Sequence, residues 1–206
     1  MNECIIIAPE VRKISLGILI GIIGLGIASL VPTAQAAPIV INFDDRPGQS
    51  APFGEGVAVP LRFLVHDEYL SLGVRFDSAG GGICILAPIN PVSRPNIAGA
   101  AGPGPVISYT HPMEASFWVN NLPGVVDFVS ITLTNSSRTS SFRAFDINGT
   151  LLDSATGGAS ATLTVRSPGA IHSVRIEQGP MGFDNFTFDG LVEAIVPVGS
   201  DSHGWF

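Results

Sequence analysis

Short runs of alternating hydrophobic and polar residues occupy most of the chain from residue 39 onward. The clearest run covers 126–134, where β-branched and aromatic residues are interspersed with polar ones. In 141–147, Phe142 and Ala144 fall on one face and Arg143 falls on the other. A period of two residues is typical of β-strands that bury one face. The same pattern predicts further strands at 69–76, 115–120, 150–153, 161–166, 171–177 and 185–188.

Segments rich in glycine and proline separate these predicted strands. Asn148-Gly149 predicts a tight hairpin because both residue types tolerate a positive φ, and Ser167-Pro168-Gly169 predicts another turn. We predict loops at 45–56 and 87–105, because proline cannot donate to the ladder of a central strand. Together these features predict roughly nine or ten short strands in a β-sandwich or barrel. No stretch has the helical period that a βαβ fold requires.

The N-terminal segment has a different character from the rest of the chain. Arg12 and Lys13 precede an uncharged apolar run at 14–31, and small residues surround Ala36. This order is typical of a secretory signal peptide that is cleaved after Ala36. An uncleaved membrane anchor is the alternative, since the run approaches the length that spans a bilayer. We therefore expect a signal peptide at 1–36, one β-sandwich domain at 37–194 and a frayed tail at 195–206.

Charge and cysteine content narrow the possible partners. The whole chain has a formal net charge of −7, and every basic residue after Ala36 is arginine. An acidic surface makes nucleic acid an unsuitable partner. Cys84 is the only cysteine after the predicted cleavage site, so the domain forms no internal disulfide. We expect Cys84 to be a buried small hydrophobe, with a reactive thiol as the alternative.

Four short motifs in order carry a resemblance to a known family. They are Asn42-Phe43-Asp44-Asp45, the segment 67–76, Phe145-Asp146-Ile147-Asn148-Gly149 and the segment 182–188. This series resembles secreted bacterial proteins of the PEP-CTERM group. Their ectodomain is similar to the jelly-roll sandwich of galactose-binding-like and carbohydrate-binding modules. The resemblance implies an all-β antiparallel β-sandwich of the jelly-roll type, with its first and last strands side by side.

The C-terminal segment departs from that group. Its members end with Val-Pro-Glu-Pro, an apolar helix and a basic pair, whereas here Val196-Pro197 is followed by Val198-Gly199. We therefore expect a soluble secreted product that lacks the sorting anchor. We also expect no stable membrane insertion once the signal peptide is removed.

Acidic residues at the two ends of the predicted domain suggest a metal site. Asp44 and Asp45 follow the first strand, and Asp184 lies in the last one. If these strands are neighbours, the carboxylates meet and repel one another unless a cation lies between them. Calcium takes six to eight oxygen ligands, so we predict a structural calcium ion held by Asp44, Asp45 and Asp184. Asp67 and Glu68 are second candidates, and the alternative is a set of solvated acids paired with arginine.

One aromatic residue has the pattern of a ligand-binding side chain. If Phe117 and the valine after Trp118 face inward, alternation places Trp118 outward together with Asn120. Aromatic faces cover the apolar patches of sugars, while amides and guanidinium groups bind the hydroxyls. We therefore predict ligand binding by Trp118, Tyr109, Asn120 and Arg94. A tryptophan that only covers a sheet edge would show the same pattern.

Three functional hypotheses remain at this point. The chain has no Gly-x-Ser-x-Gly, His-Glu-x-x-His or phosphate-loop motif, so we assign no catalytic residues. The leading hypothesis is a secreted, non-catalytic module that binds a polysaccharide or an exopolysaccharide matrix and carries a structural calcium. The second is an extracellular structural or interaction protein without a small ligand. The third is a polysaccharide lyase or hydrolase.

Overall fold

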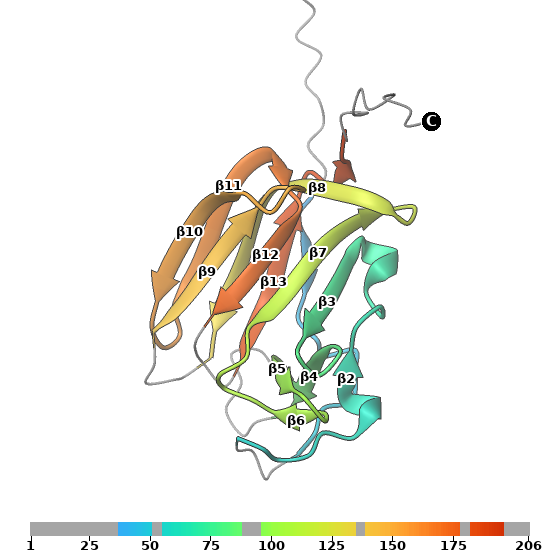
Figure 1. Ribbon diagram of the computed structural model, residues 1–206, viewed down its shortest axis with the longest axis vertical. Helices are drawn as coiled ribbons and strands as arrows, with labels where there is room; N and C mark the ends of the chain where they lie inside the picture. The colour runs from blue at the N-terminus through green and yellow to red at the C-terminus, as the bar shows by residue number, and fades with distance from the viewer. Residues whose placement is uncertain (1–36, 51–54, 88–95, 135–138, 178–181, 196–206) are drawn as a thin grey trace, which may run out of the picture. The chain divides into compact units, whose positions relative to one another are not determined.

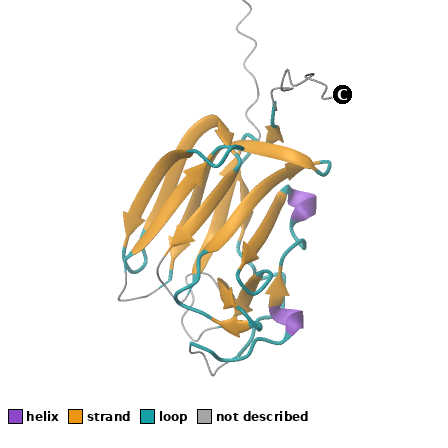
Figure 2. Ribbon diagram, in the orientation of Figure 1, coloured by secondary structure: helices purple, strands orange, loops and turns teal. Residues whose placement is uncertain are grey.

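The computed structural model describes residues 37–50, 55–87, 96–134, 139–177 and 182–195, and the regular secondary structure of these residues is almost entirely β (Figure 2). Two single turns of 3-10 helix interrupt it, η1 (Leu61–Phe63) and η2 (Leu70–Leu72). The strands are β1 (Ile39–Ile41), β2 (Leu64–Val65), β3 (Val74–Ser78), β4 (Ile83–Leu86), β5 (Ile97–Gly102), β6 (Val106–Ile107), β7 (Met113–Val119), β8 (Leu122–Leu133), β9 (Ser140–Phe145), β10 (Leu151–Gly157), β11 (Thr162–Ile171), β12 (Ser173–Glu177), β13 (Phe183–Asp189) and β14 (Val192–Glu193).

The strands form two facing layers (Figure 1). One layer has the order β10-β9-β12-β7-β3. The other has β11-β8-β13, and both β1 and β5 pair with the far edge of β13. The pairings β1-β13-β8-β11 and β7-β12-β9-β10 are those of an eight-stranded jelly roll. All strand pairs are antiparallel, which confirms the predicted all-β sandwich.

The pairing of β1 with β13 confirms that the first and last strands predicted from the sequence are neighbours. Ile39 lies opposite Phe188, and Ile41 lies opposite Phe186. Phe186 and Phe188 have no exposed surface, because they point between the two layers. Phe186 contacts Phe76 at a ring-centroid distance of 5.1 Å, so β13 is packed against the opposite layer. Full burial of an aromatic side chain contributes about 1.5–3 kcal/mol of transfer free energy.

A smaller hydrophobic cluster forms around β4 and β5. Cys84 lies in it with no exposed surface, as expected for a small buried hydrophobe. Its thiol donates to the carbonyl oxygens of Gly99 and Ala100 at 3.3 and 3.4 Å. β5 corrects the prediction of a loop at 87–105, because all six of its residues are buried and it lies between β4 and β13. Its small side chains allow this close packing, and β5 itself contains no proline.

Two other local predictions need correction. The predicted turn at 167–169 lies within β11, where the register shifts between Arg166 and Ile171, so it is an irregularity of a longer strand. The predicted strand at 69–76 begins only at Val74, after η2 and Gly73. The short strands β2, β4, β5, β6 and β14 raise the total in the described part of the chain to fourteen, above the nine or ten predicted.

The predicted signal peptide at 1–36 and the residues after 195 lie outside the described part of the chain, so secretion stays a prediction. Within the described part, no helix has the length and apolar character needed to cross a bilayer.

Candidate functional site

Trp118 lies on the outer face of β7, as the alternation predicts. The neighbouring Phe117 is fully buried, whereas Trp118 and Ser116 are partly exposed. The indole Nε1 donates to Ser116 Oγ at 2.9 Å, and the ring meets the His172 imidazole edge-on at a centroid distance of 6.1 Å. These two contacts hold the indole in one orientation, which is a requirement for an aromatic group that receives a ligand.

Asn120 and Asn121 form the two-residue hairpin that connects β7 to β8. Trp118 pairs with Pro123, and the two asparagines have φ angles of 52° and 66°. Positive φ at both central positions is typical of a type I′ turn, which asparagine tolerates better than most residues. Both asparagines are exposed, so the hairpin presents two amide groups beside the tryptophan.

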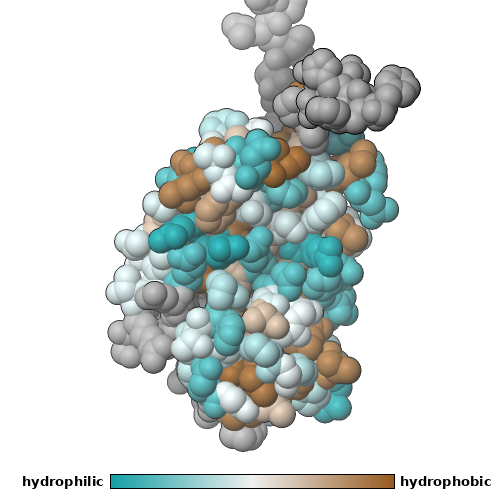
Figure 3. All heavy atoms as spheres, in the orientation of Figure 1, coloured by the Kyte–Doolittle hydropathy of each residue, from teal (hydrophilic) through white to brown (hydrophobic). Residues whose placement is uncertain are grey.

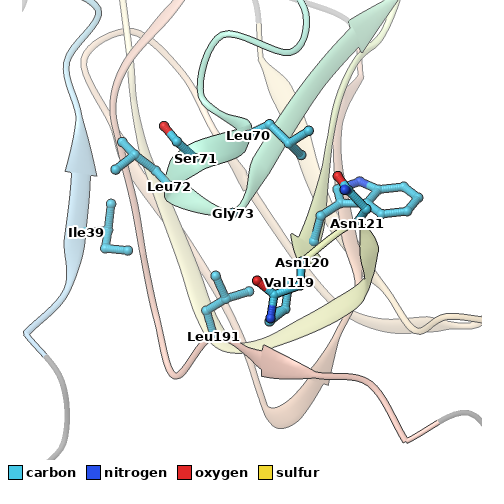
Figure 4. Close-up of a pocket in the computed structure, with 10 residues that line it drawn as sticks. Ile39, Leu70, Ser71, Leu72, Gly73, Val119, Asn120, Asn121 and Leu191 are labelled. Atoms are coloured by element: carbon cyan, nitrogen blue, oxygen red, sulfur yellow. The ribbon is translucent and has the colours of Figure 1, made fainter.

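A cavity of about 440 Å³ opens beside this hairpin (Figure 4). Its volume lies within the range of about 300–1,000 Å³ that is common for small-molecule sites. Ile39, Leu72 and Leu191 point into it from three separate segments of the chain (Figure 4). The remaining lining residues are Leu70, Ser71, Gly73, Trp118, Val119, Asn120 and Asn121. The cavity is therefore largely apolar, with amide and hydroxyl groups at its edge.

Gly73 is required for the shape of this cavity. Its φ angle is +87°, a left-handed conformation that other residues adopt at a cost. A Cβ at position 73 would overlap Leu191 Cδ2 and lie 3.0 Å from the Trp118 carbonyl oxygen. The Gly73 carbonyl accepts the backbone N–H of Trp118 at 2.9 Å, so the glycine also fixes the end of β7.

A second, smaller hollow of about 160 Å³ lies on another side of Trp118. It is lined by Asp67, Leu70, Arg75, Trp118 and Asn121. Arg75 Nε lies 3.2 Å from Asp67 Oδ1, so a guanidinium and a carboxylate enter the hollow as a pair. Sequence reasoning did not assign Arg75 to the site, because only the pairing of β3 with β7 brings it beside the tryptophan.

Polar side chains gather across the middle of the outer face of the layer that carries Trp118 (Figure 3). Arg175 on β12 lies opposite Glu114 on β7 and opposite Arg143 on β9. Like charges directly opposite each other are unfavourable, but each arginine has a carboxylate partner here. Arg175 Nη2 lies 2.9 Å from Glu114 Oε2, and Arg143 Nη1 lies 3.0 Å from Glu177 Oε2. This face is thus charged but locally neutral.

The structure brings only part of the predicted ligand set together. Trp118 and Asn120 line the same cavity. Tyr109 follows β6 and packs on the cluster that contains Cys84. β6 lies at the opposite end of the domain from the β7–β8 hairpin (Figure 1). Arg94 lies outside the described residues.

The predicted calcium ligands each accept a hydrogen bond from the protein. Asp44 Oδ1 accepts the backbone N–H of Asn96 at 3.0 Å, and Asp45 accepts the hydroxyl of Tyr69. Asp184 has no exposed surface and accepts the N–H of the next residue at 2.7 Å. Among the described residues, no group of three or more His, Cys, Asp or Glu side chains is arranged to hold a metal ion. The three aspartates therefore do not form a ready ligand group, and calcium binding stays a prediction.

Two polar groupings could be mistaken for catalytic machinery. Ser108 Oγ lies 2.7 Å from His111 Nδ1 and 3.1 Å from Glu55 Oε1, so the serine stands between the other two. In a catalytic triad the histidine lies between the serine and the acid, so this order is not that of an activated serine nucleophile. Burial, and then the neighbouring Asp45 carboxylate, raise the pKa of Tyr69 above its usual range, so this phenol keeps its proton and is a poor base.

Comparison with known proteins adds little. No protein-family model matches the chain, and no curated protein matches it. Among solved structures, the enzymatically active domain of bacteriophage CBA120 tailspike protein 4 aligns with 12% identity and a TM-score of 0.29. The alignment covers 65% of this chain and 22% of that one, so this chain spans about a fifth of that structure. At this TM-score the likeness supports no conclusion about function.

Proposed function

We propose that this chain is a secreted, non-catalytic β-sandwich module that binds carbohydrate at the cavity beside the β7–β8 hairpin. The supporting observation is the position of Trp118, which is held partly exposed at the wall of a cavity of about 440 Å³. The amides of Asn120 and Asn121 lie at the same wall. An aromatic face with planar amide groups beside it matches the apolar and hydroxyl-bearing faces of a sugar ring.

The signal-like segment at 1–36 supports a role outside the cell, where polysaccharides are abundant. A structural protein without a small ligand, which is the alternative, would need no cavity. A cavity with amide and hydroxyl groups at its edge therefore favours the binding module.

Binding to a panel of immobilised glycans tests the proposal. The wild-type domain is compared with Trp118→Ala, which removes the indole, and with Trp118→Phe, which keeps an aromatic ring. Phe128→Ala is the matched control, because Phe128 is also a partly exposed aromatic residue but lies on the outer face of β8 in the other layer.

We expect Trp118→Ala to weaken binding at least tenfold, which corresponds to about 1.4 kcal/mol. Trp118→Phe should retain part of the affinity, and Phe128→Ala should retain nearly all of it. Unchanged binding by Trp118→Ala would remove the tryptophan from the site. Failure of the wild type to bind any glycan would reject the proposed function.

A further inference from the structure

The two hollows beside the β7–β8 hairpin share one wall. Leu70, Trp118 and Asn121 line both the larger cavity and the smaller hollow. A ligand made of linked rings can therefore contact the tryptophan from both hollows, with one ring in each. A ligand with a single ring can fill only one of them.

The smaller hollow differs from the larger one in its chemistry. Arg75 Nε and Nη2 lie 3.0 and 2.9 Å from His66 Nε2, and Asp67 Oδ1 lies 3.1 Å from His66 Nδ1. With Nδ1 protonated, the imidazole donates to Asp67 and accepts from Arg75. These contacts fix the plane of the guanidinium and the position of the carboxylate before any ligand arrives. Such a pair offers both donors and acceptors to neighbouring hydroxyl groups.

The charge around this hollow disfavours anions. Asp77 lies 3.9 Å from the same imidazole, and Glu68 Oε2 accepts the backbone N–H of His66. The carboxylates of Asp67, Glu68 and Asp77 thus outnumber the guanidinium groups of Arg75 and of Arg46, whose Nη2 lies 3.4 Å from the Glu68 carbonyl oxygen. The chain as a whole has a net charge of −7. A uronic acid would meet like charge on approach, whereas a neutral sugar would not.

We propose that the hollow formed by Asp67, Arg75 and Asn121 is a second sugar subsite, and that the ligand is an uncharged glycan of at least two linked sugars. Trp118 separates the two subsites, and Arg75 and Asp67 bind hydroxyl groups of the second ring. This inference rests on the proposed function, because it names the ligand class of the same site.

Calorimetric titration with oligosaccharides of defined length tests it. The probes are neutral gluco-, xylo-, manno- and galacto-oligosaccharides of one to four sugars, together with oligogalacturonates and alginate oligosaccharides of equal length. The variants are Arg75→Met and Asp67→Asn. Arg143→Met is the matched control, since the side chains of Arg75 and Arg143 are 40% and 43% exposed and each has a carboxylate partner. Arg143 lines neither hollow.

We expect the wild type to bind a neutral disaccharide at least tenfold more tightly than the monosaccharide, and to bind the uronates more weakly. Arg75→Met and Asp67→Asn should lose this gain with length while keeping monosaccharide affinity, and Arg143→Met should behave as the wild type. Thermal melting of each variant shows whether a lost affinity gain comes from unfolding. Asp67→Asn keeps the side-chain shape, so it tests the subsite with little disturbance of the fold.

Glycan binding that is insensitive to both substitutions, or tighter for uronates, would overturn the second subsite and leave the proposed function standing. Absence of any glycan binding by the wild type would overturn both.

Discussion

Cys84 should make this domain sensitive to alkali. Its thiol has no exposed surface and donates to the carbonyl oxygens of Gly99 and Ala100. Burial raises the pKa of Cys84 from 9.0 to about 12. The unfolded chain therefore releases this proton near its ordinary pKa, while the folded domain keeps it to a much higher pH.

The sign and size of the effect follow from proton linkage. Between pH 9 and pH 12 the unfolded state binds fewer protons than the folded state, so the free energy of unfolding falls as the pH rises. The stabilising contribution is fully present below pH 9 and is lost by pH 12. Three pKa units correspond to about 4 kcal/mol, a large share of the roughly 5–15 kcal/mol by which a domain is stable.

Two tyrosines also titrate in this range, because burial raises the pKa of both Tyr69 and Tyr109. The chain after Ala36 contains no lysine, and its arginines stay charged in this range. Tyr69 acts in the same direction from about pH 10, because burial and Asp45 raise its pKa. Tyr69→Phe therefore separates its contribution from that of Cys84.

Urea unfolding followed by circular dichroism, in reductant from about pH 8 to about pH 11, checks the prediction for wild type and Cys84→Ala. The packing lost with the buried sulfur lowers the free energy of unfolding of Cys84→Ala by an amount that does not depend on pH. As the pH rises above 9, however, the wild-type curve should fall progressively more steeply, and its extra slope should approach about 1.4 kcal/mol per pH unit. Parallel curves for the two proteins would refute the reasoning.

Three other predictions address the core, the cavity and the metal. Phe186→Ala should lower the free energy of unfolding by about 3–5 kcal/mol and Phe186→Leu by under about 1.5 kcal/mol, as measured in urea, and equal costs would argue against a tightly packed core. Gly73→Ala should cost more stability than Gly149→Ala. Gly149 also has a positive φ, +80°, but a Cβ there would meet no neighbour, so Gly149→Ala measures the backbone cost alone, about 1–2 kcal/mol. Equal melting midpoints would show that the overlap with Leu191 is easily relieved. Calcium at the predicted site should raise the thermal midpoint relative to chelator in wild type but not in Asp44→Asn, and identical midpoints in wild type would reject the site.

The strands that could be predicted from the sequence are those that bury one face. In β7 and β9 the alternation is visible because most outward positions are polar, and the inward Phe117 and Phe142 are indeed fully buried. β5 shows no alternation, because it is buried on both faces and built from small residues. The prolines of the segment 87–105 lie outside β5, so the composition of the whole segment predicted a loop.

Only the site residues that are close together in the sequence could be predicted as neighbours. Trp118 and Asn120 are two residues apart, so the alternation of one strand relates them. Arg75 and Leu191 reach Trp118 through strand pairing and through the path of the chain after β13. The sequence around Arg75 and around Leu191 does not indicate that either residue lies beside Trp118. Tyr109 illustrates the same limit, because nearness in sequence to Trp118 did not place it in the same cavity.

The larger cavity lies where the polypeptide enters and leaves the domain. Ile39 opens β1, Leu191 follows β13, and both line its wall. A support attached close to Ile39 or to Leu191 would therefore sit next to the opening and obstruct a long polymer more than a short one. Capture assays on a domain immobilised in that way would underestimate affinity for intact polysaccharide, and titration in free solution avoids that bias.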